Sequence, residues 1–343
     1  MGIKIKDIVE PKKISISDLS GKSLAVDSFN ILYQFLTTIR QPDGTPLMDK
    51  NNMITSHLVG LFSRTTKLMM NNIKLAFVFD GKTPELKSKE QKRRKQAKEE
   101  AQEKYKIAME KQDIEAMKKY ASRTTVLTKE IIDEAKILIR ALGMPIIQAP
   151  SEGEAQAAYM AKKNDIFGTV SQDGDSLIFG APRFVRNLSL TQRKKSQNKL
   201  SYEKTSPEII SLNDTLNSMQ INIDQLIIYA ILVGTDYNSG GVKGIGPKTA
   251  IKLVKEYRDR YDELFKEVCW DEYFDYPWSN VYDVIKKMPA TDDYELKWNS
   301  PDTKAIKELL VEKHDFSEER VDSVLEELKT KMDTRQKGLG DFF

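Results

Sequence analysis

The feature that most constrains the fold is a set of short apolar segments, each followed closely by acidic residues. Residues 22–27 end at Asp27, residues 73–80 end at Asp80, and residues 167–171 lead into Asp173. Runs of this kind are typical of buried strands, and parallel strands present their carboxyl ends at one edge of a sheet. The pattern therefore predicts a mainly parallel sheet with acids gathered along one edge.

The stretch 142–180 contains a complete strand, helix, strand unit. Residues 145–148 and 167–171 are the expected strands, and the Ala-rich segment 151–163 is the expected helix. Glu152 and Glu154 fall in the first turn of that helix, and Asp175 follows Asp173 after the second strand. A purely structural interpretation is also open, because Ser151 with Glu154 fits a capping box and Asp-Gly-Asp makes an ordinary turn.

Carboxylates gathered in this way need positive charge nearby to offset their repulsion. Burying several of them together raises their pKa values and costs several kcal/mol unless cations are present. The chain has one cysteine, Cys269, and two histidines, His57 and His314, so a thiolate or histidine-rich metal site is excluded. Oxygen ligands favour Mg²⁺ or Mn²⁺, and two such ions about 4 Å apart can promote phosphodiester cleavage.

A highly charged segment follows Asp80 and extends to about residue 124. It lacks a conventional apolar face, so a solvated helix with ion pairs along it is one interpretation. Lys87 and Arg94 are seven residues apart, which places them on one face of a helix about two turns apart. Both residues follow Asp80 closely in the sequence, and they are expected to neutralise phosphate oxygens there.

The segment 221–233 is strongly apolar, is expected to be helical, and leads into Gly234 and Asp236, the seventh acid of the series. A Gly-x-Gly-Pro turn then opens an amphipathic helix over residues 247–257. Exposed backbone N–H groups at such a turn can hold a phosphate without reading bases, although an ordinary helix start is the alternative.

Composition limits the size and the class of the protein. The chain has 343 residues, 40% hydrophobic and 31% charged, which is enough for one large domain or two smaller ones. Its net charge is only +3, so any basic surface must be local. No apolar run approaches the ~20 residues of a membrane span, and no signal peptide is evident. With a single cysteine as well, we expect an intracellular protein without membrane association.

Five motifs together resemble the flap structure-specific endonucleases, within the wider family of structure-specific 5′ nucleases. They are VDSFNILYQF, FVFDGKTPELKSKE, APSEGEAQAAY, SQDGDSL and VGTDYNSGGVKGIGPKTA, and the resemblance runs from residue 1 to 343. It implies an α/β fold: a mainly parallel twisted sheet with helices on both faces, a helical arch, and a helix-two-turn-helix DNA-binding element. The implied regions are an N-terminal nuclease region (1–98), an arch segment (99–115, within an arch of roughly 82–130), an internal nuclease region (116–258), a C-terminal helical region (259–330) and a clamp-binding tail (331–343).

The resemblance also implies roles for individual residues. Two Mg²⁺ ions, with Mn²⁺ as a substitute, are expected on seven acids: Asp27, Asp80, Glu152, Glu154, Asp173, Asp175 and Asp236. Lys87 and Arg94 are expected to contact the scissile phosphate, and Tyr33 to stack on the base beside the cut. The expected DNA contacts also include Arg40, Arg64, Glu152, Gly234, Asp236, Gly244, Gly246 and Lys248. A K⁺ ion is expected at the helix-two-turn-helix.

The implied activity is hydrolysis of branched DNA at 5′ flap junctions, with 5′ to 3′ exonuclease activity, in Okazaki fragment processing and DNA repair. The final residues resemble the short motif that binds PCNA-type sliding clamps, with Gln336, Leu339, Phe342 and Phe343 as the contact residues. A tail folded back on the core is the alternative. The absence of a long basic extension after this motif looks archaeal, which implies a cytoplasmic protein.

Two rival functions are consistent with parts of the sequence. Asp173-Gly-Asp175-Ser176 after an apolar strand resembles aspartyl-phosphate phosphatases, but in those enzymes the pair follows the first strand and here it comes late. A non-catalytic scaffold for DNA junctions would be expected to have lost an acid, and none of the seven is missing.

Overall fold

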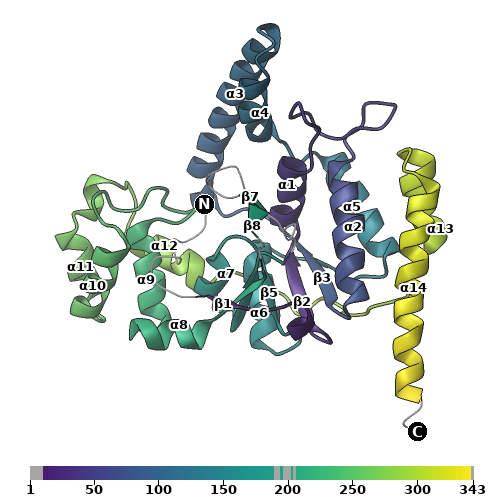
Figure 1. Ribbon diagram of the computed structural model, residues 1–343. Coiled ribbons are helices and arrows are strands. Elements are labelled where there is room, and N and C mark those ends of the chain that lie inside the picture. Colours follow the sequence, from purple (N-terminus) through teal and green to yellow (C-terminus); the bar gives the residue numbers. More distant parts are fainter. Residues whose placement is uncertain (1–10, 189–193, 196–201, 204–205, 341–343) are drawn as a thin grey trace.

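The computed structural model describes residues 11–188, 194–195, 202–203 and 206–340, and its centre is a seven-stranded sheet (Figure 1). The strand order is β1-β9-β6-β5-β2-β3-β4. The five strands from β6 to β4 are parallel, whereas β9 pairs antiparallel with both β6 and the edge strand β1. The bounds are β1 Lys12–Lys13, β2 Ser23–Asp27, β3 Lys74–Phe79, β4 Ile146–Gln148, β5 Gly168–Val170, β6 Arg183–Arg186 and β9 Glu208–Ser211. The expected mainly parallel sheet is confirmed, and β7 (Lys194–Lys195) and β8 (Tyr202–Glu203) form a separate ribbon.

Helices cover both faces of the sheet, which explains why its central strands are apolar on both sides. Alternate residues of β2 and β3 face opposite layers: Val26 and Phe77 pack with one core, and Ala25 packs with another. The first layer contains α1 (Ser28–Thr38), α2 (Ser56–Met70) and α5 (Lys129–Ala141). The second contains α6 (Gly153–Lys162), whose small Ala side chains pack closely on the sheet.

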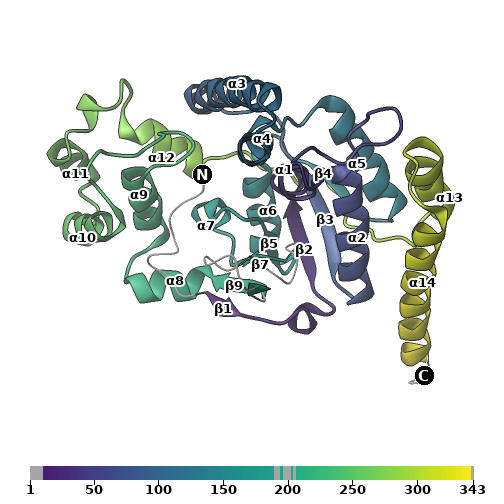
Figure 2. The ribbon, with the colours of Figure 1, turned by 45° about the horizontal axis from the view of Figure 1, so that its top comes forward.

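The remaining helices form two groups on opposite sides of the sheet (Figures 1 and 2). One group contains α8 (Leu212–Met219), α9 (Ile223–Val233), α10 (Pro247–Tyr257), α11 (Tyr261–Glu267) and α12 (Trp278–Lys286), with the buried α9 at its core. The other contains α13 (Thr303–Lys307), a π-helix (Glu308–Lys313) and α14 (Glu318–Gly340), which pack beside α2 and α5. The short α7 (Asp175–Ile178) follows β5.

Within the described residues, no single helix has both the length and the apolar character needed to cross a membrane. The pair α8 and α9 meets that test only jointly, across a bend of 78°.

The charged segment forms a helical hairpin that stands away from the sheet (Figure 1). Its helices are α3 (Ser88–Glu110) and α4 (Ile114–Ala121). We call this hairpin the arch. Only Glu90, Ala101 and Ala108 of α3 are buried, in agreement with the expected lack of an apolar face. Lys87 ends a 3₁₀ turn (Glu85–Lys87) and is the N-cap of α3 with helical backbone angles, and its side chain and that of Arg94 both reach Asp236, so the predicted shared face is confirmed.

The capping-box interpretation of Ser151 and Glu154 was wrong. The N-cap of α6 is Glu152, and it makes no side-chain capping bond. The Ser151 hydroxyl instead donates to the carbonyl oxygen of Lys82, 2.8 Å away, and so ties the start of α6 to the segment after β3. Both glutamates are therefore free of a capping role. The prediction for α10 is confirmed, since Pro247 occupies its first turn.

Candidate active site

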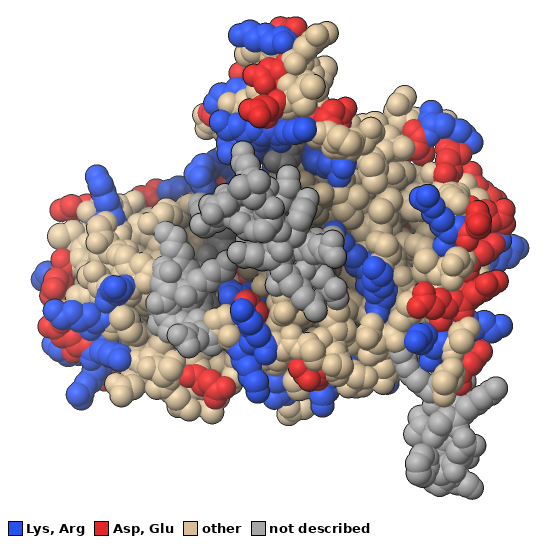
Figure 3. Space-filling model, in the orientation of Figure 1, with Lys and Arg blue, Asp and Glu red and all other residues tan. Residues whose placement is uncertain are grey.

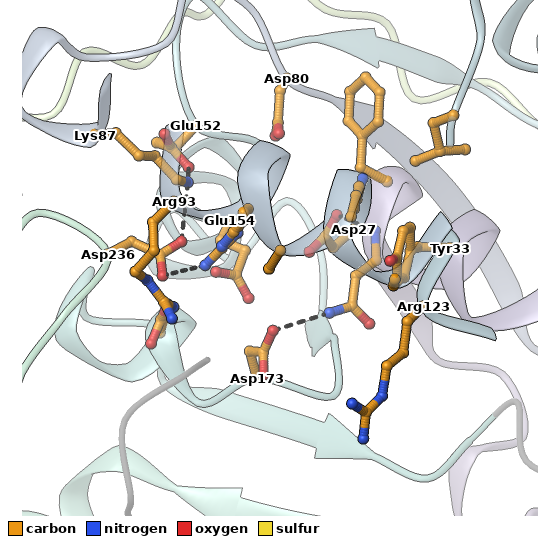
Figure 4. A pocket seen from close by; sticks show the side chains of 18 of the residues that line it. Asp27, Tyr33, Asp80, Lys87, Arg93, Arg123, Glu152, Glu154, Asp173 and Asp236 are labelled. Atoms are coloured by element: carbon orange, nitrogen blue, oxygen red, sulfur yellow. Dashed lines mark hydrogen bonds and ion pairs between the residues drawn. The ribbon is translucent and has the colours of Figure 1, made fainter. Parts of the chain in front are cut away.

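All seven predicted acids line one cleft of about 820 Å³ between the sheet edge and the base of the arch (Figure 4). Five separate segments deliver them. Asp27 ends β2 and Asp80 follows β3. Glu152 and Glu154 lie at the start of α6, and Asp173 and Asp175 at the start of α7. Asp236 follows α9. The parallel register explains part of this convergence, because Asp27 lies opposite Val78 and Val26 lies opposite Val170.

Hydrogen bonds from neighbouring backbone and side chains hold three of these carboxylates in place. Asp27 Oδ1 accepts from the Asn30 backbone at 3.0 Å, and Asp80 Oδ1 accepts from the Gly153 backbone at 2.7 Å. A Cβ at Gly153 would lie only 2.8 Å from Asp80 Oδ1, so the absence of a side chain leaves room for this approach. The Asn30 amide donates to Asp173 Oδ2 at 3.2 Å, which links the ends of β2 and β5 (Figure 4).

The electrostatics of the cleft favour an added cation. Burial, together with repulsion from Asp80, raises the pKa of Asp27 to about 8. Burial and the charge of Glu152 raise the pKa of Asp80 to about 6. Burial and Asp175 hold the pKa of Glu154 well above its usual value, and Glu154 Oε1 is buried without a hydrogen-bond partner. A clustered set of oxygen donors with an unsatisfied buried oxygen fits a hard divalent cation such as Mg²⁺.

Two basic side chains lie beside these acids in the structure. Lys87 Nζ is 2.7 Å from Glu152 Oε2 and 3.3 Å from Asp236 Oδ2, and Arg94 Nη2 is 2.5 Å from Asp236 Oδ1. Although burial disfavours its charge, Glu152 and Asp236 raise the pKa of Lys87 above its usual value. Across the described part of the chain, no three His, Cys, Asp or Glu side chains are already close enough around one point to hold a metal ion. The acids are therefore gathered in one cleft, and two of them are paired with cations of the protein itself.

Sequence reasoning missed several residues of the cleft. The pocket is also lined by Phe29, Asn30, Arg93, Ala97, Lys98, Glu100, Ala101, Lys104, Tyr120, Arg123 and Leu127. Lys98 follows Arg94 by one helical turn and its Nζ lies 5.4 Å from the centre of the Tyr33 ring, so the helical spacing used for Lys87 and Arg94 would have found it. Tyr120 and Arg123 lie at and just after α4, and they reach the cleft only because the arch folds back on itself.

Tyr33 lines the cleft, whereas Arg40 and Arg64 do not. The Arg40 guanidinium donates to the carbonyl oxygens of Leu36 and Gly44 and to the Thr125 hydroxyl, so it ties the end of α1 to the residues after the arch. Arg64 lies over the ring of Phe35, 5.0 Å from its centre. In this structure both side chains contact other parts of the protein.

The predicted glycines and Lys248 lie outside the cleft, in the turn between α9 and α10 and at the start of α10. Gly244 has a φ of +85°, and a Cβ there or at Gly246 would meet no atom within 4 Å, so this backbone is open to a ligand. Gly234 differs, because a Cβ there would lie 2.6 Å from the Gly241 nitrogen. Close packing inside the turn explains glycine at position 234.

The predicted clamp-binding residues fall largely beyond the described part of the chain. Phe342 and Phe343 lie outside the described residues. The backbone of Gln336 and Leu339 belongs to the end of α14, but their side chains are not among those described.

The family models that match this chain fit the position of the cleft. The XPG N-terminal domain matches residues 1–101, and the XPG I-region matches residues 143–236. These two regions together carry all seven acids, and the residues between them include most of the arch.

Individual relatives extend the match to nearly the whole chain. Flap endonuclease 1 of Thermococcus onnurineus is 50% identical over 96% of this chain and 95% of its own length. Flap endonuclease 1 of Staphylothermus marinus is 47% identical over 100% of both chains. Among solved structures, flap endonuclease-1 from Methanococcus jannaschii is 41% identical, with a TM-score of 0.76 over 97% of this chain and 100% of that one. With the acidic cleft, the arch and the glycine-rich turn in place, these matches show that the chain belongs to the flap endonuclease family, the DNA nucleases that cut 5′ flaps.

Proposed function

We propose that the acidic cleft hydrolyses a DNA phosphodiester bond at the base of a 5′ flap with two divalent cations, Mg²⁺ with Mn²⁺ as a substitute. One observation carries this proposal: seven acids from five distant segments line a single cleft, and burial and mutual repulsion raise the pKa of Asp27, Asp80 and Glu154. Gathering these charges in one cleft destabilises the folded state, and bound cations would offset that cost in free energy.

All seven acids are the proposed metal ligands. When bound, two such ions supply an activated water and stabilise the leaving oxygen. The chain's contribution is to hold the carboxylates together. Asn30 and the Gly153 backbone fix the orientation of Asp173 and Asp80, and β2 and β3 carry Asp27 and Asp80 to the same edge of the sheet.

Lys87 and Arg94 are the proposed catalytic contacts to the scissile phosphate. Their present partners, Glu152 and Asp236, belong to the proposed metal-binding set. Cations held by those acids would neutralise them and leave both basic groups available to phosphate oxygens, whose negative charge increases in the transition state. Tyr33, with Lys98 over its ring, is the proposed stacking surface for the base beside the cut.

The turn before α10 is the proposed grip on the duplex. Its supporting features are the open backbone at Gly244 and Gly246, the absence of a side-chain cap at Gly246, and Lys248 at the start of the helix. Backbone N–H groups at a helix N-terminus bind phosphate without reading sequence. We place the K⁺ ion at the same turn, and we keep Arg40, Arg64 and Gly234 as contacts that would need DNA to be present.

We propose branched DNA as the substrate, a PCNA-type sliding clamp as the protein partner through residues 336–343, and the cytoplasm of an archaeal cell as the place of action. On the face drawn in Figure 3 acidic and basic side chains are interspersed, with basic side chains across the lower part of the arch, which supports a local rather than a global attraction to DNA. The region boundaries given above stay part of this proposal, with the arch near residues 82–130.

The test is cleavage of an end-labelled double-flap DNA under single-turnover conditions in Mg²⁺, in EDTA, and in EDTA followed by excess Mg²⁺. A continuous duplex of the same sequence is the control. We expect one cut at the flap junction in Mg²⁺, none in EDTA, and recovery when Mg²⁺ is restored. Cleavage that persists in EDTA, or equal cleavage of the continuous duplex, would contradict the proposal.

A further inference from the structure

Glu90 is an acid at the base of the arch that the proposed chemistry does not use. It lies in the first turn of α3, and its side chain is only 3% exposed although most of α3 faces solvent. A buried carboxylate is costly unless it is paired. Its partners therefore indicate what it does.

The Glu90 carboxylate is surrounded by donors. Oε1 accepts from Arg93 Nη2 and from Arg94 Nε, both at 2.7 Å, and Oε2 accepts from Arg93 Nε at 2.8 Å. The Ser239 hydroxyl also bonds to this carboxylate, and hydrogen bonds from Arg93 above all lower the pKa of Glu90 to about 2. Glu90 is thus charged, and it joins the base of the arch to the turn that precedes α10.

The bond to Arg94 has a specific geometry. Glu90 takes the Nε edge of the guanidinium, while Nη2 reaches Asp236 Oδ1 at 2.5 Å. A guanidinium is a rigid planar fork with five N–H donors, so fixing Nε fixes the direction of both terminal amino groups. Arg94 lines the acidic cleft, and those terminal groups are the ones left for a ligand there.

We propose that Glu90 is a positioning residue for cleavage: it holds the Nε edge of Arg94 so that the terminal amino groups meet the scissile phosphate when phosphate replaces Asp236 as their acceptor. This inference rests on the proposed role of Arg94. Through its bond to Ser239, the same carboxylate also links the arch to the turn before α10. Arg94 is therefore held in a fixed orientation relative to the turn that is proposed to bind the duplex.

The base of α3 has other anchors, which makes the proposal testable by substitution. Leu86 packs against the core that contains α9, and Lys87 bonds to Glu152. Glu90→Gln keeps the shape of the side chain and removes its charge. Glu99→Gln is the matched control, because Glu99 lies on the same helix with a cation at the i,i+4 spacing, Lys95, but is 63% exposed.

The experiment is a double-mutant cycle on single-turnover flap cleavage at saturating enzyme, with flap affinity measured separately by anisotropy. We expect Glu90→Gln to slow cleavage about tenfold with affinity within about twofold, Arg94→Ala to slow it more, and the double variant to equal Arg94→Ala within about twofold. Glu99→Gln should cut at the wild-type rate.

Two results overturn the inference while leaving the role of Arg94 intact: a normal rate for Glu90→Gln beside a slow Arg94→Ala, or effects of the two substitutions that multiply. A normal rate for Arg94→Ala removes the proposed role of Arg94 and the role of Glu90 with it. If Glu90→Gln lowers the melting temperature more than Glu99→Gln does, the same cycle with Glu90→Asp decides. That variant keeps the charge but is one methylene shorter, and it should also slow cleavage only when Arg94 is present.

Discussion

At the scale of single residues, the cleft brings together buried acids that repel one another and two basic side chains that pair with acids. Asp27 and Glu154 are acids in a buried, like-charged setting, and their raised pKa values record the resulting free-energy cost. Lys87 and Arg94 offset part of that cost by pairing with Glu152 and Asp236. Under the proposed function, bound cations would take the place of Lys87 and Arg94 beside Glu152 and Asp236, and phosphate would take the place of these acids beside the two basic groups.

Asp175→Ala is expected to reduce the single-turnover rate of flap cleavage at least tenfold and to leave junction binding within about threefold. The substitution removes a proposed metal ligand but not the backbone grip before α10. Rates at saturating enzyme and affinity in Ca²⁺ would be measured beside Asp293→Ala, an exposed acid on the surface. A variant that keeps more than a tenth of the wild-type rate would argue against the two-metal assignment.

Lys87→Ala is expected to slow the chemical step by about 100-fold, since a preorganised donor to transition-state charge contributes about 3 kcal/mol. Flap affinity should change far less, because Lys87 is one of many contacts. Lys92→Ala is the control, an exposed lysine on α3 that does not line the cleft. If Lys87→Ala and Arg94→Ala both cut at the wild-type rate, the charged segment has no catalytic role.

At the scale of elements, a buried polar cluster fastens the C-terminal helices to the nuclease core. His314 is 2% exposed, and its ring nitrogens lie 2.9 Å from Asp49 Oδ2 and 3.0 Å from Glu134 Oε1. Lys313 Nζ is 2.7 Å from the same Glu134 oxygen. Glu134 belongs to α5, Asp49 to the segment before α2, and the other two to the end of the π-helix, so the His314 ring joins three segments of the chain.

This cluster predicts acid sensitivity. Burial would raise the pKa of Glu134, but its interactions with His57 and Lys313 outweigh burial and lower that pKa from 4.5 to about 2. A lowered pKa stabilises the folded state above the unfolded value, and that stability is lost as the pH falls from about 4.5 toward about 2. Glu134→Gln is expected to lower the free energy of unfolding by about 2–3 kcal/mol at pH 7, near the lower end for a broken buried pair because Lys313 is half-exposed.

Urea unfolding of Glu134→Gln and the wild type at several pH values would check this. The difference in unfolding free energy should shrink as the pH falls from about 4.5, where the carboxylate of the unfolded chain takes up a proton, toward about 2, where that of the folded chain does. Asp133→Asn, an exposed acid one residue earlier on α5, is the control and should change little. A difference that stays constant from pH 7 to pH 3 would show that Glu134 contributes by packing and not by charge.

At the scale of the whole molecule, the helix α14, which leads into the proposed clamp-binding residues, begins away from the acidic cleft (Figure 1). The helix α14 packs beside α2, on the side of the sheet opposite the α9–α10 turn (Figure 1). A tether at that end would raise the local concentration of the enzyme at flaps without reshaping the cleft.

Deleting residues 339–343 is therefore expected to abolish binding to a PCNA-type clamp and clamp-stimulated cleavage. Cleavage without the clamp should stay within about twofold of the full chain, because the described residues that line the cleft all lie between Asp27 and Asp236. Calorimetry with the purified clamp would measure the affinity, and a tail of the same composition in scrambled order is the control. An unchanged affinity after deletion would refute the assignment.

The sequence by itself determined the elements and the identity of the acids. Apolar strands that end at or near acids stand out locally, as do the Ala-rich α6, the buried α9 and the Pro247 start of α10, because strand burial, helix period and capping depend on neighbours in the chain. The motifs around Asp27, Asp80, Asp173 and Asp236 were then sufficient to indicate the family.

Tertiary structure alone decided which groups face one another. The bond of Asn30 to Asp173 spans 143 positions and that of Arg94 to Asp236 spans 142, and no local pattern encodes such pairs. The fold of the arch brought Tyr120 and Arg123 to the cleft. Contacts between distant segments likewise paired Ser151 with the Lys82 carbonyl and Arg40 with Thr125. Secondary structure follows from short-range preferences. The partners of a buried charge depend on the tertiary structure. The free energy of such a charge depends on every group within a few ångströms, whatever the separation of these groups in the sequence.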